Sequence, residues 1–338
     1  MRITGVYFFL VLNIALCLPN HALGAAALGG ETPQAGTWAS TNVQHAYGLP
    51  DTKPKQKGKL TVNADGLTFT GKSSAYTIPR SSIIAVSSGN ERVELWGMKG
   101  RILRMAIPNG GGLAAAGVMH HKVNMLTVEF NDVRAGYHGA VFYLSASDAE
   151  RILASFSQMP PTHHEAPATL QETPVQACLN SAVNPRSVLV TAPVWDHTEV
   201  PAAYRALVYE HIVDRMQSLD GIGHVYREGE DNRQYGCPER AICISIASFK
   251  QGSQVKRAVM GPVGFFVGTT QMSFNANITD VSGQLNVTEQ LKATVRGESE
   301  SKNVADSVAK KLAKRYSVAV KNFEKVRTVN STDTARLR

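Results

Sequence analysis

Two glycine-rich segments come nearest to a recognisable binding motif in this sequence. One reads Gly-Pro-Val-Gly-Phe-Phe-Val-Gly over residues 261–268, and the other reads Pro-Asn-Gly-Gly-Gly-Leu-Ala-Ala-Ala-Gly-Val over residues 108–118. A phosphate-binding loop needs a strand before it, a helix after it and usually a Lys-Ser or Lys-Thr pair, whereas the residues from Gln271 onward alternate like a strand. We therefore expect no nucleotide site. The simplest interpretation of residues 261–268 is a glycine-rich connection between strands, and that of residues 108–118 is a buried interdomain contact or a short internal helix.

The same two segments have a second interpretation as contact loops. Both are uncharged, and Phe265 and Phe266 stand in the middle of one of them, where they can enter a partner groove or a membrane surface. The residues assigned to these contact loops are Gly110, Gly111, Gly112, Leu113, Gly261, Gly264, Phe265, Phe266 and Gly268.

The other reactive side chains do not form a catalytic pattern. The sequence contains no Gly-x-Ser-x-Gly elbow that would present a nucleophilic serine. The neighbouring residues His120 and His121 point to opposite faces of a strand, so they do not hold one metal ion together. Glu228 and Glu230 fall in a polar loop. The sequence therefore predicts no catalytic residue, no cofactor and no metal site, and it favours a protein that is not an enzyme.

The chain begins with the pattern of a secretory signal peptide. Met1-Arg2 precede an apolar run over residues 6–18, and residues 22–24 place small side chains where a signal peptidase reads. Cleavage is expected before Ala25, which makes residues 1–24 the signal peptide. No later segment reaches 18 apolar residues, so we expect no transmembrane helix after cleavage. The expected location is the periplasm or the cell envelope of a bacterium.

Removal of the leader leaves three cysteines in an oxidising compartment, namely Cys178, Cys237 and Cys243. Gly236 and Pro238 beside Cys237 predict a turn that brings Cys237 and Cys243 together. The expected disulfide joins these two residues and leaves Cys178 unpaired.

The positive charge of the chain is confined to its C-terminal end. Residues 302–338 contain ten Lys or Arg and three acidic residues, a net charge of +7 out of a formal total of +8. Nucleic-acid binding is not expected, because no stacking platform or groove-reading motif accompanies the charge. Lys310, Lys314 and Lys321 project from the polar face of the predicted last helix, and they are either a solvated surface or contacts to an anionic envelope surface.

The elements fall into two predicted domains. Residues 25–57 read as an irregular lead-in. Residues 58–157 predict an all-β barrel or sandwich, because alternation on both sides of Asp65-Gly66 gives a hairpin and further short strands lead to a closing helix at 148–156. A proline-rich linker follows at residues 158–186.

The second predicted domain, residues 187–323, is an α+β sandwich of about five strands and two helices. Its order is a strand at 187–195, a helix at 201–219, strands at 223–227, 241–249, 271–280 and 284–296, and a helix at 303–323. Residues 324–338 read as a basic polar tail.

Part of the second domain resembles a bacterial envelope family known as domain of unknown function 4410. The resemblance covers about residues 187–323 and depends on Arg257 before a glycine-rich loop, followed by a strand with Asp280 and Gly283. It implies a periplasmic or cell-envelope setting and no known catalytic activity. Residues 58–157 resemble a bacterial pleckstrin-homology-like (PH-like) barrel in strand number and closing helix.

These features together predict an uncharacterised exported cell-envelope protein that serves as a non-catalytic binding or scaffolding module. The expected partner is an envelope protein or an anionic envelope surface. Two alternatives stay open. One is an exported hydrolase whose site, built from Glu228, Glu230 or a serine, lies at the domain junction, and the other is a peripheral binder of an anionic membrane surface.

Overall fold

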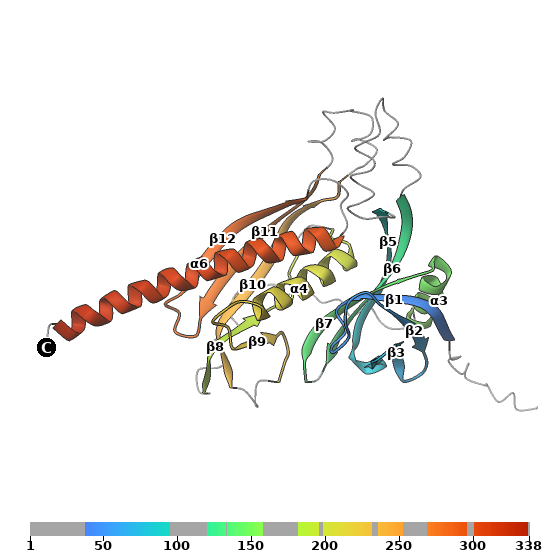
Figure 1. Ribbon diagram of the computed structural model, residues 1–338, viewed down its shortest axis with the longest axis horizontal. Helices are drawn as coiled ribbons and strands as arrows, with labels where there is room; N and C mark the ends of the chain where they lie inside the picture. Colours follow the sequence, from blue (N-terminus) through green and yellow to red (C-terminus); the bar gives the residue numbers. More distant parts are fainter. Residues whose placement is uncertain are drawn as a thin grey trace, which may run out of the picture. The chain divides into compact units, whose positions relative to one another are not determined.

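The computed structural model describes residues 38–94, 120–132, 134–157, 182–195, 199–231, 236–252, 269–295 and 301–336 (Figure 1). These residues form mostly β structure in two sheets, with a long helix at the C-terminal end. This agrees with the expected predominance of strands and with the expected last helix.

The first sheet has seven antiparallel strands in the spatial order β4-β3-β2-β1-β7-β6-β5. The strands are β1 (Trp38–Tyr47), β2 (Gln56–Val62), β3 (Gly66–Gly71), β4 (Ala75–Pro79), β5 (Ile83–Glu94), β6 (His120–Asp132) and β7 (Gly136–Leu144), with a 3-10 turn, η1 (Arg80–Ser82), between β4 and β5. Among the described residues β4 and β5 are the two edge strands and do not pair with each other, so the sheet is not closed. Of the two expected forms, a barrel or a sandwich, the closed barrel is therefore not what forms.

The helix α3 (Ala146–Phe156) follows β7 directly. Its N-cap is Ser145, whose side chain accepts a hydrogen bond from the backbone N–H of Asp148 at 3.1 Å. Ile152 and Phe156 are buried, and they join a core formed by one face of the first sheet. The predicted closing helix is confirmed.

The structure corrects the expectation of an irregular lead-in for residues 38–47. These residues form β1 in the middle of the first sheet, between β2 and β7. The alternation that would reveal the strand is broken by a bulge between Ser40 and Val43, and its buried positions include the polar residues Ser40 and His45. A search for alternating apolar residues therefore misses it.

The second sheet has five strands in the order β12-β11-β10-β8-β9. The strands are β8 (Val183–Val190), β9 (His224–Arg227), β10 (Cys237–Lys250), β11 (Thr270–Asp280) and β12 (Asn286–Val295). The β10-β8 and β8-β9 pairs are parallel, and the other two pairs are antiparallel. Two helices, α4 (Ala202–Gln217) and α6 (Ser301–Arg336), run beside each other and against this sheet (Figure 1).

The last helix is longer than expected, because α6 continues through the residues predicted as a tail and ends at Arg336. The apolar stripe that defines it in the sequence weakens after Phe323, but no glycine or proline follows to stop the helix. The buried stripe itself is as predicted, with Val304, Val308, Leu312 and Tyr316 all less than 5% exposed.

The two sheets are joined through β7 and α4, and both belong to one compact unit of the chain. Strand β7 is buried on both faces: Ala140 and Phe142 face the first core, whereas Tyr137 and Val141 belong to the core that α4, α6 and the second sheet share. The predicted division into separate domains stays a prediction.

The expected disulfide between Cys237 and Cys243 is wrong. Cys243 is a free thiol, whereas Cys237 is disulfide-bonded. Both residues lie on the continuous strand β10, with no turn between them. Six residues of extended strand separate their Cα atoms by roughly 20 Å, and a disulfide requires less than about 7 Å.

Candidate functional site

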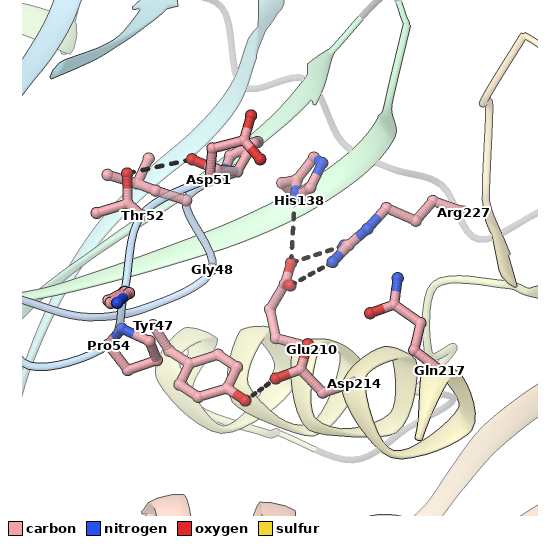
Figure 2. Close-up of a pocket in the computed structure, with 13 residues that line it drawn as sticks. Tyr47, Gly48, Asp51, Thr52, Pro54, His138, Glu210, Asp214, Gln217 and Arg227 are labelled. Atoms are coloured by element: carbon pink, nitrogen blue, oxygen red, sulfur yellow. Dashed lines mark hydrogen bonds and ion pairs between the residues drawn. The ribbon is translucent and has the colours of Figure 1, made fainter. Parts of the chain in front are cut away.

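A polar pocket of about 520 Å³ opens where β1, β7 and α4 meet (Figure 2). One wall is the loop that links β1 to β2, and the other walls come from β7, from α4 and from the end of β9. The lining residues are Tyr47, Gly48, Leu49, Pro50, Asp51, Thr52, Lys53, Pro54, His138, Glu210, Asp214, Gln217 and Arg227.

The β1–β2 loop, which forms one wall of the pocket, is held in its conformation by His45, a fully buried residue of β1. Its Nε2 accepts a hydrogen bond from the backbone N–H of Leu49 at 3.1 Å, and its Nδ1 lies 3.3 Å from the carbonyl oxygen of Lys53. One tautomer, with the proton on Nδ1, satisfies both contacts. Burial lowers the pKa of His45, which keeps the ring neutral and the loop anchored.

Glu210 is the charged centre of the site. It lies on α4 with only 2% of its surface exposed, and its two oxygens accept hydrogen bonds from Arg227 at 3.0 and 2.7 Å. The backbone N–H of Gly139 on β7 donates to Oε1 at 3.0 Å. Burial by itself would raise the pKa of Glu210, but the charge and hydrogen bonds of its partners outweigh burial and lower this pKa to about 2. The carboxylate therefore stays ionised and links α4, β7 and β9.

His138 is the second buried polar group of the pocket, with 4% of its surface exposed. Its ring stacks on Phe130, with the ring centroids 5.3 Å apart and an interplanar angle of 15°. Its Nδ1 faces Glu210 Oε1 at 3.6 Å, a distance too long for a hydrogen bond (Figure 2). Neither ring nitrogen has a hydrogen-bond partner in the part of the chain that the structure describes.

A third group, Tyr47 with Asp214 and His211, connects the loop to α4. The Tyr47 hydroxyl donates to Oδ2 of Asp214, and the Tyr47 ring stacks on His211 at a centroid distance of 4.5 Å. Burial raises the pKa of Asp214 despite this hydrogen bond, and burial lowers the pKa of His211 to about 4. The group therefore contains an imidazole that is neutral in the folded protein at pH 7.

Replacing His211 by phenylalanine is expected to reduce the loss of unfolding free energy that accompanies a fall in pH from 6.5 to about 4. An exposed histidine binds its proton near pH 6.5, whereas folded His211 resists protonation down to about pH 4. Folding is therefore progressively penalised as the pH falls between these two values, and His211→Phe removes the penalty while keeping a ring on Tyr47. Urea denaturation of both proteins at several pH values measures this, and equal slopes would contradict it.

The residues predicted from the sequence are not the ones that line the pocket. The two contact loops, residues 110–113 and 261–268, lie outside the described residues. Lys310, Lys314 and Lys321 are exposed on α6, as expected for a polar helix face. Across the described ranges no group of three or more His, Cys, Asp or Glu side chains is placed to hold a metal ion.

The acidic residues assigned to a hydrolase alternative serve as structural acceptors. Glu228 accepts a hydrogen bond from the backbone N–H of Ala192 at 2.5 Å, and Glu230 accepts one from the backbone N–H of Arg227 at 2.8 Å. Neither lines the pocket. A sequence clue to this pocket existed in Glu210, a carboxylate among the apolar positions of the helix at 202–217.

No protein-family model and no curated protein matches this chain. Among solved structures, it is similar to a point variant of the PelC dodecamer from Paraburkholderia phytofirmans, with 20% identity and a TM-score of 0.28, over 38% of this chain and 88% of the other. The PelC dodecamer of that organism matches with 18% identity and a TM-score of 0.28, over 39% and 88% of the two chains. A protein described as uncharacterised matches with 6% identity and a TM-score of 0.23, over 42% and 92%.

Within the described ranges, none of the helices combines the length and the apolar character needed to cross a bilayer.

Proposed function

We propose that this chain is an exported cell-envelope protein that binds a small polar ligand in the pocket between β1, β7 and α4, and that it catalyses no reaction. The leader at residues 1–24 supports export, and the polar pocket supports ligand binding. The single observation on which the proposal depends is the buried imidazole of His138, which has no hydrogen-bond partner among the described residues.

The environment of His138 determines what it can bind. The carboxylate of Glu210 beside Nδ1 favours the tautomer with its proton on that nitrogen. Nε2 then presents an unshared electron pair and acts as a hydrogen-bond acceptor. An unsatisfied buried polar atom costs about 1–3 kcal/mol, and a ligand with a hydroxyl or amine donor recovers this cost when it binds.

The other polar groups of the pocket widen the choice of ligand without adding a strong net charge. Asp51 supplies acceptors, Lys53 supplies donors, and the Gln217 amide supplies both. A volume of about 520 Å³ lies within the ordinary range for small-molecule sites. The ligand class that fits is a small compound with several hydroxyl or amino groups, such as a sugar or an amino sugar.

Binding is favoured over catalysis because the two carboxylates that α4 contributes to the pocket, those of Glu210 and Asp214, are already engaged. Glu210 is held by Arg227 and Gly139, and its pKa of about 2 makes it a poor proton acceptor at neutral pH. Asp214 accepts the hydroxyl of Tyr47. Neither group is free to act as a general base, so the site is better suited to recognition.

Replacing His138 by phenylalanine is expected to abolish ligand binding while leaving stability within about 1 kcal/mol of the wild type. Phenylalanine keeps the stack on Phe130 and removes the unsatisfied nitrogens. Thermal-shift measurements with polyols, amines and matched carboxylic acids test the binding, and urea denaturation tests the stability. The control is His224→Phe, because His224 lies outside the pocket lining and should leave binding unchanged.

Two outcomes would count against the binding role of His138. Equal ligand affinity in wild type and His138→Phe would show that the His138 imidazole does not contribute to ligand binding. A large loss of stability in the variant without ligand would assign His138 a structural role instead.

An exported hydrolase is the second candidate, and one observation favours it. Glu210 and His138 form a carboxylate–imidazole pair at a pocket wall, and such a pair can orient an imidazole as a general base. Turnover of ester, amide or glycoside test substrates that disappears in His138→Phe would support this function over simple binding.

The resemblances to the domain of unknown function 4410 family and to a PH-like barrel are consistent with the proposal. The first implies a periplasmic or cell-envelope setting and no known catalytic activity, and both resemblances stay predictions. A scaffolding role for the same modules would show itself as retention of an envelope protein in a pull-down that the pocket variant His138→Phe does not affect.

A further inference from the structure

The helix α6 carries the positive charge of the molecule on an exposed face that the pocket does not use. Residues 302–338 account for +7 of the formal charge of +8, and α6 runs for 36 residues through this region. At 1.5 Å per residue the helix is about 54 Å long. Figure 1 shows its C-terminal part extending past the strands of the second sheet.

Five of the six lysines of α6, all except Lys302, form a single stripe. With about 100° of rotation per residue, their positions fall within roughly 100° of the helix circumference, opposite the buried apolar stripe. The residues of this lysine stripe are Lys310, Lys311, Lys314, Lys321 and Lys325, all exposed, with Val318 among them at 43% exposure.

Most of the stripe is not neutralised by acidic neighbours. Lys310 pairs with Asp306 at 2.7 Å, and Lys311 donates to a backbone carbonyl. Lys314, Lys321 and Lys325 have no carboxylate within ion-pair distance in the described part of the chain. Three unpaired ammonium groups on one helix face over 12 residues concentrate positive potential at a surface.

We infer that the lysine stripe of α6 is a docking surface for an anionic phospholipid membrane. The stripe is a nearly straight row of point charges rather than a pocket, and lysine favours this kind of diffuse attraction to phosphate groups over geometric recognition. Val318 places an exposed apolar side chain between the charges, where it can contact the interfacial region. The inference is independent of the ligand pocket, because none of the residues that line the pocket lies on α6.

Vesicle flotation of the full chain tests the inference. The vesicles contain phosphatidylcholine alone or phosphatidylcholine with phosphatidylglycerol, at low and high salt. We expect binding only to the anionic vesicles, with release as salt rises, because exposed charges are screened over about 10 Å at 0.1 M. Replacing Lys314, Lys321 and Lys325 together by glutamine should weaken binding on the order of a hundredfold.

A matched control distinguishes the effect of the lysine stripe on binding from the effect of net charge alone. Replacing Lys57, Lys59 and Lys72, which are exposed on the first sheet, by glutamine removes the same charge and should leave binding unchanged. Circular dichroism and thermal melting verify that both triple variants are folded. Equal loss of binding in the two variants, no binding of the wild type to anionic vesicles, or binding to a soluble acidic polymer in preference to the vesicles would each overturn the inference.

Discussion

Replacing Glu210 by leucine is expected to lower the free energy of unfolding by about 3–5 kcal/mol. The variant leaves the guanidinium of Arg227 without its bidentate partner and leaves the backbone N–H of Gly139 without its acceptor. Because Arg227 is largely buried, water cannot readily replace the lost carboxylate. Urea or guanidinium denaturation at pH 7 measures the loss.

Two further variants test this explanation. The double variant Glu210→Leu, Arg227→Met should recover part of the stability, because it no longer contains an unpaired buried charge. Asp306→Ala breaks the exposed pair with Lys310, in which both side chains are about half exposed, and should change stability by less than about 1 kcal/mol. A loss as large in Asp306→Ala as in Glu210→Leu would show that burial is not the cause.

The acid dependence of the same pair follows from the direction of its pKa shift. The folded-state pKa of Glu210 lies at about 2, below the ordinary value of 4.5. The stabilisation is therefore fully present above the ordinary value, and it is lost as the pH falls from there through the folded-state pKa. The wild type should lose stability in this window, whereas Glu210→Leu should show a flatter profile.

Replacing Gly139 by alanine is expected to destabilise the protein by about 3 kcal/mol and to disturb the pocket. A Cβ atom at this position would lie 2.5 Å from Cβ and 2.8 Å from Cα of Ala206 on α4. Such distances require β7 and α4 to move apart, which also displaces Glu210 from the Gly139 N–H. Loss of stability and loss of ligand binding should therefore occur together.

The partner residue provides the control for this prediction. The double variant Gly139→Ala, Ala206→Gly removes the Cβ–Cβ overlap and should recover part of the stability, although the Ala206 Cα would remain close. Gly89→Ala places a methyl group where no atom lies within 4 Å and should be nearly neutral. If Gly139→Ala were as mild as Gly89→Ala, the tight contact between β7 and α4 would not be needed.

The sequence predicted regular elements better than it predicted the site. The hairpin around Asp65-Gly66 and the buried stripe of α6 follow local periodicity, and both are present. Strand β1 was not predicted, because its buried face contains the polar residues Ser40 and His45 and the strand includes a bulge. Local patterns reveal an element only when its buried side chains are apolar and regularly spaced.

The pocket could not be predicted because its members come together only through tertiary packing. His138 and Glu210 lie 72 positions apart, and Arg227 follows 17 positions later. Glu210 differs from its apolar neighbours on the helix, but nothing in the sequence connects it with His138 or Arg227. The disulfide error has the same origin, since closeness of Cys237 and Cys243 along the chain says nothing of their separation on an extended strand.

The position of β1 in the middle of the first sheet has a consequence for the order of folding. One edge of β1 pairs with β2, which follows directly, but the other edge pairs with β7, where Gln44 lies opposite Tyr143. Bringing together strands about a hundred residues apart is entropically costly and slow. Because the chain is synthesised from its N-terminus, β1 and β2 are made long before β7. The edge of β1 that pairs with β7 therefore stays unpaired until β7 has been made. We expect the early hairpins to remain loosely structured until then, which is the state that the proposed export across a membrane would require.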